Sequence, residues 1–149
     1  MDEGDTRRMT AAIDTNIISA LWDLDPTISG AAQTALDTAL RRGRLVISAP
    51  VFGELMAAPG RDEAFLNKFL QNTGIAVEWN LEEAIWRSAG RAFQAYAARR
   101  RKQRSSGSPR RILADFVIGA HAFQRGYHLL TLDDRHYSAA FPGLAILTV

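Results

Sequence analysis

ILADFVIGAHAFQRGYHLLTLDDRHY, residues 112–137, is the stretch that decides the fold, because it joins an amphipathic helix to a buried strand. Apolar side chains recur at helical spacing over residues 109–125, which predicts a largely buried helix with Ser108 as its cap. After a turn at Gly126, the apolar run of residues 128–132 has the length and composition of a strand. This stretch therefore predicts a helix followed by a buried strand.

Acidic side chains interrupt both elements at positions where carboxylates are uncommon. Asp115 is expected about two turns into the helix, where a buried carboxylate is costly unless a cation or hydrogen bonds compensate it. Asp133 and Asp134 follow directly after the strand. In open α/β sheets, ligands bind beyond the carboxyl ends of the strands. An acid on the helix beside acids at the strand end therefore suggests a metal site at this edge of a sheet.

The first half of the chain repeats this arrangement. Residues 9–13, MTAAI, predict a short strand that ends at Asp14, and a helical pattern follows it. The strand of residues 45–47 precedes a helix that is expected to begin near Ser48 and in which Glu54 is the only charged residue. Taken alone, Asp14 is more often a helix cap, and Glu54 is more often a solvent-facing side chain.

The alternation of short apolar strands with helices predicts an α/β three-layer sandwich with a largely parallel central sheet flanked by helices. We expect residues 1–8 to be an N-terminal tail and residues 9–149 to form a single domain, in keeping with a length of 149 residues of which 47% are hydrophobic. The chain contains no cysteine, which excludes disulfides and zinc-thiolate sites. No apolar stretch reaches membrane-spanning length, so a cytoplasmic location without membrane contact is expected.

Several carboxylates gathered at one sheet edge would repel each other unless cations neutralised them. Ligands that offer only oxygen select hard ions, so Mg²⁺ is expected there, with Mn²⁺ as an alternative. Such an ion suits the hydrolysis of phosphodiester bonds, because it lowers the pKa of a bound water. Asn16 and Thr131, each two residues from an acid, are placed to hydrogen-bond a carboxylate or a metal-bound water.

Arginine outnumbers lysine sixteen to two, and many of the arginines form one basic segment. A solvated helix end explains such a run about equally well when it is considered alone. Beside an acidic pocket, nucleic-acid binding becomes the favoured explanation, because arginine binds phosphate bidentately. The arginines expected to contact a nucleic-acid backbone are Arg99, Arg100, Arg101, Arg104, Arg110 and Arg111.

The ordered acidic motifs resemble those of the PIN domain, and most closely those of the VapC-type toxins of bacterial toxin–antitoxin pairs. The resemblance spans about residues 9–149, and the residues that carry it are Asp14-Thr15-Asn16, Glu54, Asp115 within ADFVIGA, and Thr131-Leu132-Asp133. It implies a Mg²⁺-dependent endoribonuclease that is often a homodimer and is neutralised by a small antitoxin whose tail fills the active-site groove.

The resemblance also implies roles for individual residues. Asp14, Glu54 and Asp115 match the principal metal-binding acids, and Asp133 matches the fourth. Asn16 and Thr131 match the polar residues that support these acids. Asp134 is an extra acid beside the last motif, so which of Asp133 and Asp134 faces the metal stays open. RNA is then the polymer that the basic segment is expected to bind.

Other functions compete with this interpretation. A phosphoacceptor domain of the receiver type also places acids around Mg²⁺, but it needs a lysine after a late strand, and Lys68 and Lys102 both fall in expected helices. A non-catalytic RNA-binding module and a metal-dependent DNA nuclease are the remaining alternatives. The sequence leaves open which RNA is cleaved, whether one or two ions bind, and what the antitoxin is.

Overall fold

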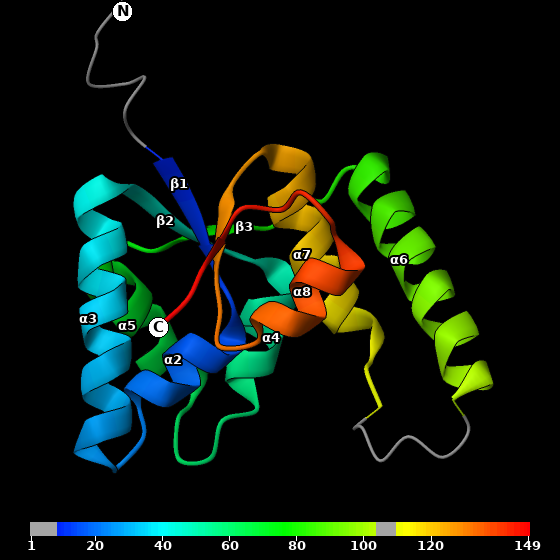
Figure 1. Ribbon diagram of the computed structural model, residues 1–149. Coiled ribbons are helices and arrows are strands. Elements are labelled where there is room, and N and C mark those ends of the chain that lie inside the picture. Colours follow the sequence, from blue (N-terminus) through cyan, green and yellow to red (C-terminus); the bar gives the residue numbers. More distant parts are fainter. Residues whose placement is uncertain (1–8, 104–109) are drawn as a thin grey trace, which may run out of the picture.

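The computed structural model describes residues 9–103 and 110–149, so the predicted tail and Arg104 lie outside the described residues. Five strands form one sheet in the order β3-β2-β1-β4-β5, and every pairing is parallel (Figure 1). The strands are β1 (Met9–Ile13), β2 (Gly43–Ser48), β3 (Ala76–Glu78), β4 (His128–Leu130) and β5 (Ile146–Leu147). The predicted parallel sheet is confirmed.

Helices cover both faces of this sheet. Figure 1 shows α2, α3 and α5 on one side of the strands and α6, α7 and α8 on the other, which confirms the predicted three-layer sandwich. The helices are α2 (Thr15–Leu21), α3 (Pro26–Arg42), α4 (Ala49–Met56), α5 (Glu63–Thr73), α6 (Glu83–Lys102), α7 (Leu113–Arg125) and α8 (Asp134–Ala140). Within the described ranges, no helix combines the length and the apolar composition needed to cross a membrane.

The order of the strands places a crevice beside β1. The chain moves from β1 to β2 and then to β3 in one direction, and it then crosses back to pair β4 with the other edge of β1. Ala12 consequently pairs with Val46 on one side and with Leu129 on the other. Such a reversal of strand order is where ligands bind in open α/β sheets, beyond the carboxyl ends of the strands.

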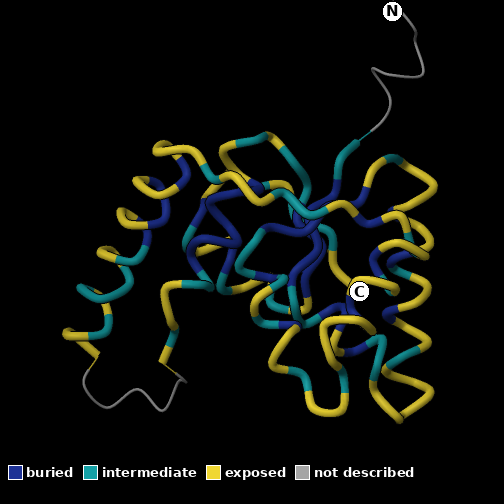
Figure 2. Tube along the Cα trace, turned by 180° about the vertical axis from the view of Figure 1, so that it is seen from behind, coloured by how far each residue is buried: buried dark blue, intermediate teal, exposed yellow. Residues whose placement is uncertain are grey.

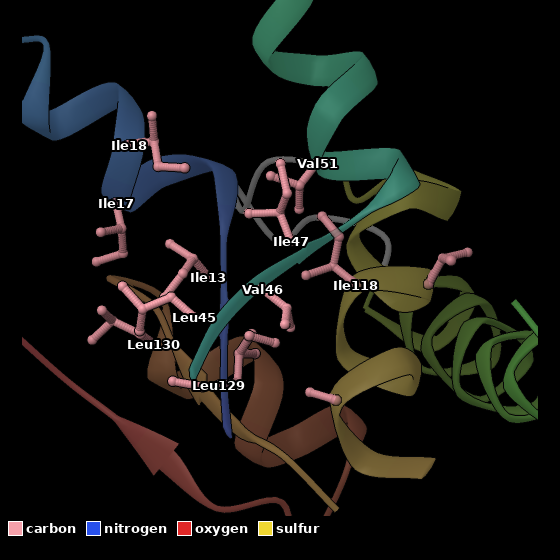
Figure 3. Packing of buried hydrophobic residues seen from close by; sticks show 14 of the residues in the cluster. Ile13, Ile17, Ile18, Leu45, Val46, Ile47, Val51, Ile118, Leu129 and Leu130 are labelled. Carbon is pink, nitrogen blue, oxygen red and sulfur yellow. The ribbon is translucent and has the colours of Figure 1, made fainter. Parts of the chain in front are cut away.

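The core explains why these short runs form central strands. Buried positions gather along the strands and on the inner sides of the helices (Figure 2). Ile13, Val46 and Leu129 are almost fully buried, and Figure 3 shows them packed among side chains that include Val51 of α4 and Ile118 of α7. Strands of a parallel sheet that helices cover on both faces have nearly continuous apolar sequences, and these strands do too. The core thereby provides a rigid support for the residues that follow each strand.

Helix α7 begins later than the sequence predicts. It starts at Leu113 rather than near residue 109, and the expected cap Ser108 lies outside the described residues. The extended backbone of Ile112 precedes the helix, and its N–H donates to Asp115 Oδ2 at 2.9 Å. Asp115 therefore stands in the first turn and not two turns in, at a position where the helix dipole favours a carboxylate. The predicted position two turns into the helix was therefore wrong, and the hydrogen bond from the Ile112 N–H is one that compensates the carboxylate.

Helix α8 packs very closely on α7. A Cβ atom added at Gly119 would lie 2.4 Å from Cε2 of Phe141 and 2.9 Å from Cδ1 of Tyr137. Carbon atoms that are not bonded to each other essentially never approach so closely. Only glycine at position 119 therefore leaves room for the rings of Phe141 and Tyr137. This contact determines where Tyr137, which is 2% exposed, stands in the fold.

A second polar network lies at the other end of α7. The ring of His121, which is fully buried, contacts Glu78 Oε1 through Nε2 at 2.8 Å. The Tyr127 hydroxyl donates to Glu78 Oε2 at 2.9 Å, and Arg125 donates to both Glu78 and Glu82. Hydrogen bonds to the ionised form of a carboxylate stabilise it. The network joins the end of β3 to α7 away from the crevice described above.

Candidate active site

The four predicted metal-binding acids, Asp14, Glu54, Asp115 and Asp133, line one cleft and are called here the cleft acids. The cleft has a volume of about 350 Å³ and lies beyond the carboxyl ends of β1 and β4, where α2 and α8 begin. Its lining residues are Asp14, Thr15, Asn16, Ser19, Glu54, Arg111, Asp115, Asp133 and Tyr137. The structure thus brings together acids that are separated by up to 119 positions in the chain.

Asp14 is the most buried of the cleft acids, with 6% of its surface exposed. It occupies the residue before α2 but forms no capping hydrogen bond with its side chain, so the helix-cap alternative does not describe it. Instead, the Thr131 hydroxyl donates to Asp14 Oδ2 at 2.7 Å. Burial raises the pKa of the Asp14 carboxyl to about 6, against the opposing effect of hydrogen bonds from Thr131 and Tyr137. The charge of Glu54 also raises this pKa, so a nearby cation would stabilise the ionised form.

Thr131 connects the turn after β1 with the turn after β4. Besides donating to Asp14, its hydroxyl oxygen accepts from the Asp133 N–H at 2.9 Å and from Asn16 Nδ2 at 3.5 Å. The Asn16 side-chain oxygen in turn accepts from the Leu132 N–H at 3.2 Å. A hydroxyl offers one donor and two acceptor sites, and Thr131 uses all three. Asn16 and Thr131, the two predicted supporting residues, thus join the turns that carry Asp14 and Asp133.

Glu54 turns toward the cleft from α4. The hydroxyl of Thr15, the residue after Asp14, donates to Glu54 Oε1 at 2.5 Å. Glu54 is half-buried and lines the cleft, so its side chain is not simply a solvent-facing charge of that helix. Neither Thr15 nor Tyr137 was among the predicted site residues. The only signal for Thr15 was a hydroxyl within the motif itself, and Tyr137 had none, because it reaches Asp14 through the packing of α8.

Asp133 makes an ion pair with an arginine inside the cleft. Arg111 Nη1 lies 2.5 Å from Asp133 Oδ2, and the two side chains are 32% and 30% exposed. Asp133 precedes α8 and forms no capping hydrogen bond with its side chain. Asp134 is the first residue of α8, is exposed and does not line the cleft. Of the two neighbouring acids, Asp133 is therefore the one that faces the other cleft acids.

The donors in the cleft have the chemistry that a hard divalent cation prefers, since the acids and their supports offer oxygen atoms. Among the described residues, however, no three side chains of Asp, Glu or His stand close enough to hold one ion together. Glu54 and Asp133 each have a carboxylate oxygen engaged by a neighbour, Thr15 or Arg111. The donor set fits Mg²⁺ or Mn²⁺, and in the structure as it stands two of these oxygen atoms contact groups of the protein itself.

The described residues of the basic segment lie at the end of the molecule that carries the cleft. Figure 1 places the end of α6 and the residues just before α7 at the same end of the molecule as the carboxyl end of β1. Arg99, Arg101 and Arg110 are exposed, and Arg100 is half-buried. Arg111 differs from these, because its side chain enters the cleft.

Comparisons with known proteins concern the family and the fold of the chain. The family model of the PIN domain matches residues 11–142. The comparison with curated proteins finds no match. Among solved structures, the chain is similar to VapBC2 from Rickettsia felis bound to a promoter DNA fragment, with 17% identity over 95% of this chain and 99% of that chain, and a TM-score of 0.66.

Two further solved structures have similar folds. VapBC-1 from nontypeable Haemophilus influenzae is 22% identical over 94% of this chain and 98% of that chain, with a TM-score of 0.64. A toxin–antitoxin complex from Klebsiella pneumoniae is 19% identical over 93% and 96% of the two chains, with a TM-score of 0.56. At these identities the likeness concerns the fold, and it extends over nearly the whole chain.

Proposed function

The chain belongs to the PIN domain family, and we propose that it is a metal-dependent endoribonuclease that hydrolyses RNA phosphodiester bonds as the toxin of a type II toxin–antitoxin pair. The observation that carries this proposal is the cleft in which the four cleft acids meet. The likeness in fold to chains of VapBC complexes supports the toxin assignment. Mg²⁺ is the proposed cofactor, with Mn²⁺ as the alternative.

The cleft acids would hold the ion, whose chemistry when bound is to lower the pKa of a water molecule and to neutralise phosphate charge. The residues of the chain supply orientation. The Thr131 hydroxyl directs Asp14 Oδ2, and the Thr15 hydroxyl directs Glu54 Oε1. Ligands held in this way by neighbouring hydrogen-bond donors keep a fixed geometry around an ion. The burial of Asp14 also lowers the local dielectric, which strengthens its attraction to a cation.

We assign contacts with the RNA backbone to the basic segment, including the exposed residues Arg99 and Arg101 at the end of α6. Arginine binds phosphate through two parallel hydrogen bonds, and each phosphate contact makes the affinity more dependent on salt. Reversing the charge of Arg99 and Arg101 is expected to weaken RNA binding and to flatten its salt dependence by roughly 0.7 in logarithmic slope for each lost contact with a single strand.

This chain has a surface beside the cleft on which the proposed antitoxin could bind. A groove of about 470 Å³ runs next to α2 and α4, and Ser19 and Glu54 line both the groove and the cleft. Leu24 lines the groove and is 98% exposed. Apolar residues left exposed around a groove often mark a protein-binding surface. A bound segment lying there would reach the cleft acids, so it would block the site directly.

A homodimer and a cytoplasmic location are further parts of the proposal, and both follow from the family resemblance. Multi-angle light scattering of the purified protein measures the first, with a mass of twice 16.4 kDa expected.

The experiment that tests the proposed activity is cleavage of total cellular RNA by the purified protein with Mg²⁺, Mn²⁺ or EDTA. Asp14→Asn and Asp133→Asn are expected to abolish cleavage, because each removes a charged oxygen ligand from the cleft. Asp134→Asn is the matched control, since it removes the same charge one residue away and outside the cleft. We expect Asp134→Asn to cleave RNA like the parent protein.

Other outcomes would identify the competing functions. Cleavage that persists in Asp14→Asn would show that the cleft is not the site. Salt-dependent RNA binding without cleavage, under every metal condition, would favour the non-catalytic binding module. Preferential cleavage of single-stranded DNA would favour a DNA nuclease.

A further inference from the structure

A positive charge of the chain's own lies among the cleft acids. Arg111 is the one cationic side chain among the described residues that line the cleft, and its guanidinium contacts Asp133 at 2.5 Å. Its neighbour Arg110 is exposed and does not line the cleft. The position of Arg111 is therefore specific to this residue and not a general property of the basic segment.

The backbone of Arg111 is held in place. Its N–H donates to the Tyr96 hydroxyl at 2.7 Å, and the Tyr96 ring packs at 5.4 Å from the ring of Phe116. Tyr96 belongs to α6 and Phe116 to α7, so the residue is fixed between these two helices. A long side chain anchored at its base loses less conformational freedom when it binds a carboxylate than one on an unconstrained surface.

We propose that Arg111 is an internal counter-cation that holds Asp133 and leaves this carboxylate when a divalent ion binds the cleft. The inference rests on the proposed function, since it takes the cleft acids as metal ligands. Two cations that share one carboxylate at a few ångströms repel each other, and a divalent ion repels the guanidinium with twice the strength of a single charge. The displaced guanidinium then stands at the edge of the cleft, where it can bind a phosphate bidentately. Arg111 would thus reduce metal affinity in the absence of substrate.

Mn²⁺ binding by the full-length protein tests this inference directly, because free Mn²⁺ is measured by electron paramagnetic resonance without any cleavage assay. We expect Arg111→Gln to bind Mn²⁺ roughly three- to tenfold more tightly than the parent. In the parent the ion must displace a partly exposed ion pair, and such pairs are weak, so the gain in affinity is modest. Arg135→Gln is the matched control: it removes the same charge from an exposed position two residues after Asp133, and less than about a twofold change is expected.

A double-mutant cycle assigns the effect to the pair. In the Asp133→Asn background, Arg111→Gln is expected to leave Mn²⁺ affinity unchanged, because the carboxylate for which the two cations compete is gone. Circular dichroism checks that each variant folds, and Arg111→Met, which keeps the aliphatic stem, replaces Arg111→Gln if that variant does not.

The outcomes separate this inference from the proposed function. If the parent binds Mn²⁺ and the two arginine variants bind it equally, Arg111 is not a competing cation, although the metal centre stands. A gain that persists without the Asp133 carboxylate also overturns the inference, because it would reflect overall charge. If neither the parent nor Arg111→Gln binds Mn²⁺, both the inference and the metal centre are wrong.

Discussion

Replacing Asp14 by Asn should make the protein more stable at neutral pH while it removes the proposed activity. Asp14 is 6% exposed, and burial raises the pKa of its carboxyl from the ordinary 3.8 to about 6. Asn has nearly the same shape, and its side-chain oxygen can still accept the hydrogen bond from the Thr131 hydroxyl. The substitution therefore removes a buried charge and keeps the hydrogen bond from the Thr131 hydroxyl.

The sign and size of the effect follow from the two pKa values. Above pH 6 the carboxyl is ionised in both the folded and the unfolded protein, and the folded state carries the full cost of the buried charge. A pKa raised from 3.8 to about 6 corresponds to about 3 kcal/mol, which is an upper estimate for the stabilisation of Asp14→Asn at pH 7.5. As the pH falls from 6 toward 3.8, the folded protein takes up the proton first, so the difference between the two proteins should shrink toward zero.

Urea unfolding followed by circular dichroism, at pH 7.5 and pH 4.5 with EDTA present, measures this difference. Repeating the pH 7.5 experiment with Mg²⁺ should stabilise the parent more than Asp14→Asn, because the variant lacks one of the four proposed charged ligands. The reasoning is refuted if Asp14→Asn is no more stable than the parent at pH 7.5, or if its advantage does not depend on pH.

Three further substitutions test other parts of the structure. Thr131→Val keeps the shape of the side chain but loses the hydroxyl that Asp14 uses, so it should cost about 1–3 kcal/mol in urea unfolding and weaken Mn²⁺ binding; unchanged values for both would contradict the described network. Burial alone would raise the pKa of Glu78, but hydrogen bonds to its carboxylate keep this pKa below the ordinary 4.5. The ionised carboxylate therefore stabilises the folded protein above pH 4.5, and this stabilisation is lost as the pH falls through the lower pKa of the folded state. Glu78→Gln should therefore cost about 2 kcal/mol at pH 7 and less at pH 3.5, as followed by thermal unfolding, and a cost independent of pH would refute this explanation. Gly119→Ala should cost about 1–3 kcal/mol because its Cβ would overlap the ring of Phe141, and a stability equal to that of the parent would show that α8 can move away.

Much of the fold could be predicted because its signals are local. Short apolar runs followed by helical patterns indicated the central strands, and the rule for parallel sheets indicated that acids such as Asp14 and Asp133 would meet at one edge. The start of α7 could not be predicted in this way. The local cap signal at Ser108 favours an earlier start, whereas in the structure the Ile112 N–H donates to Asp115 and the helix begins at Leu113.

The contents of the cleft were predicted less completely than its position. Arg111 belongs to a basic run in which each arginine has the same local signal, and only its contacts with Tyr96 and Asp133 turn it inward. Tyr137 reaches Asp14 because glycine at position 119 lets α8 approach α7. Such contacts depend on the tertiary structure, so a single sequence does not contain a local signal for them.

The hydrogen bond between Thr131 and Asp14 joins residues 117 positions apart, and this separation has a consequence for synthesis of the chain. A ribosome that makes the protein produces β1 and α2 first, and it must add more than a hundred further residues before the partners of Asp14 on the far side of the cleft appear. Until then the nascent chain lacks Asp133 and the β4 strand that positions it. We expect a truncated product that ends before residue 131 to be inactive, so the proposed activity cannot arise while only the first half of the cleft has been synthesised.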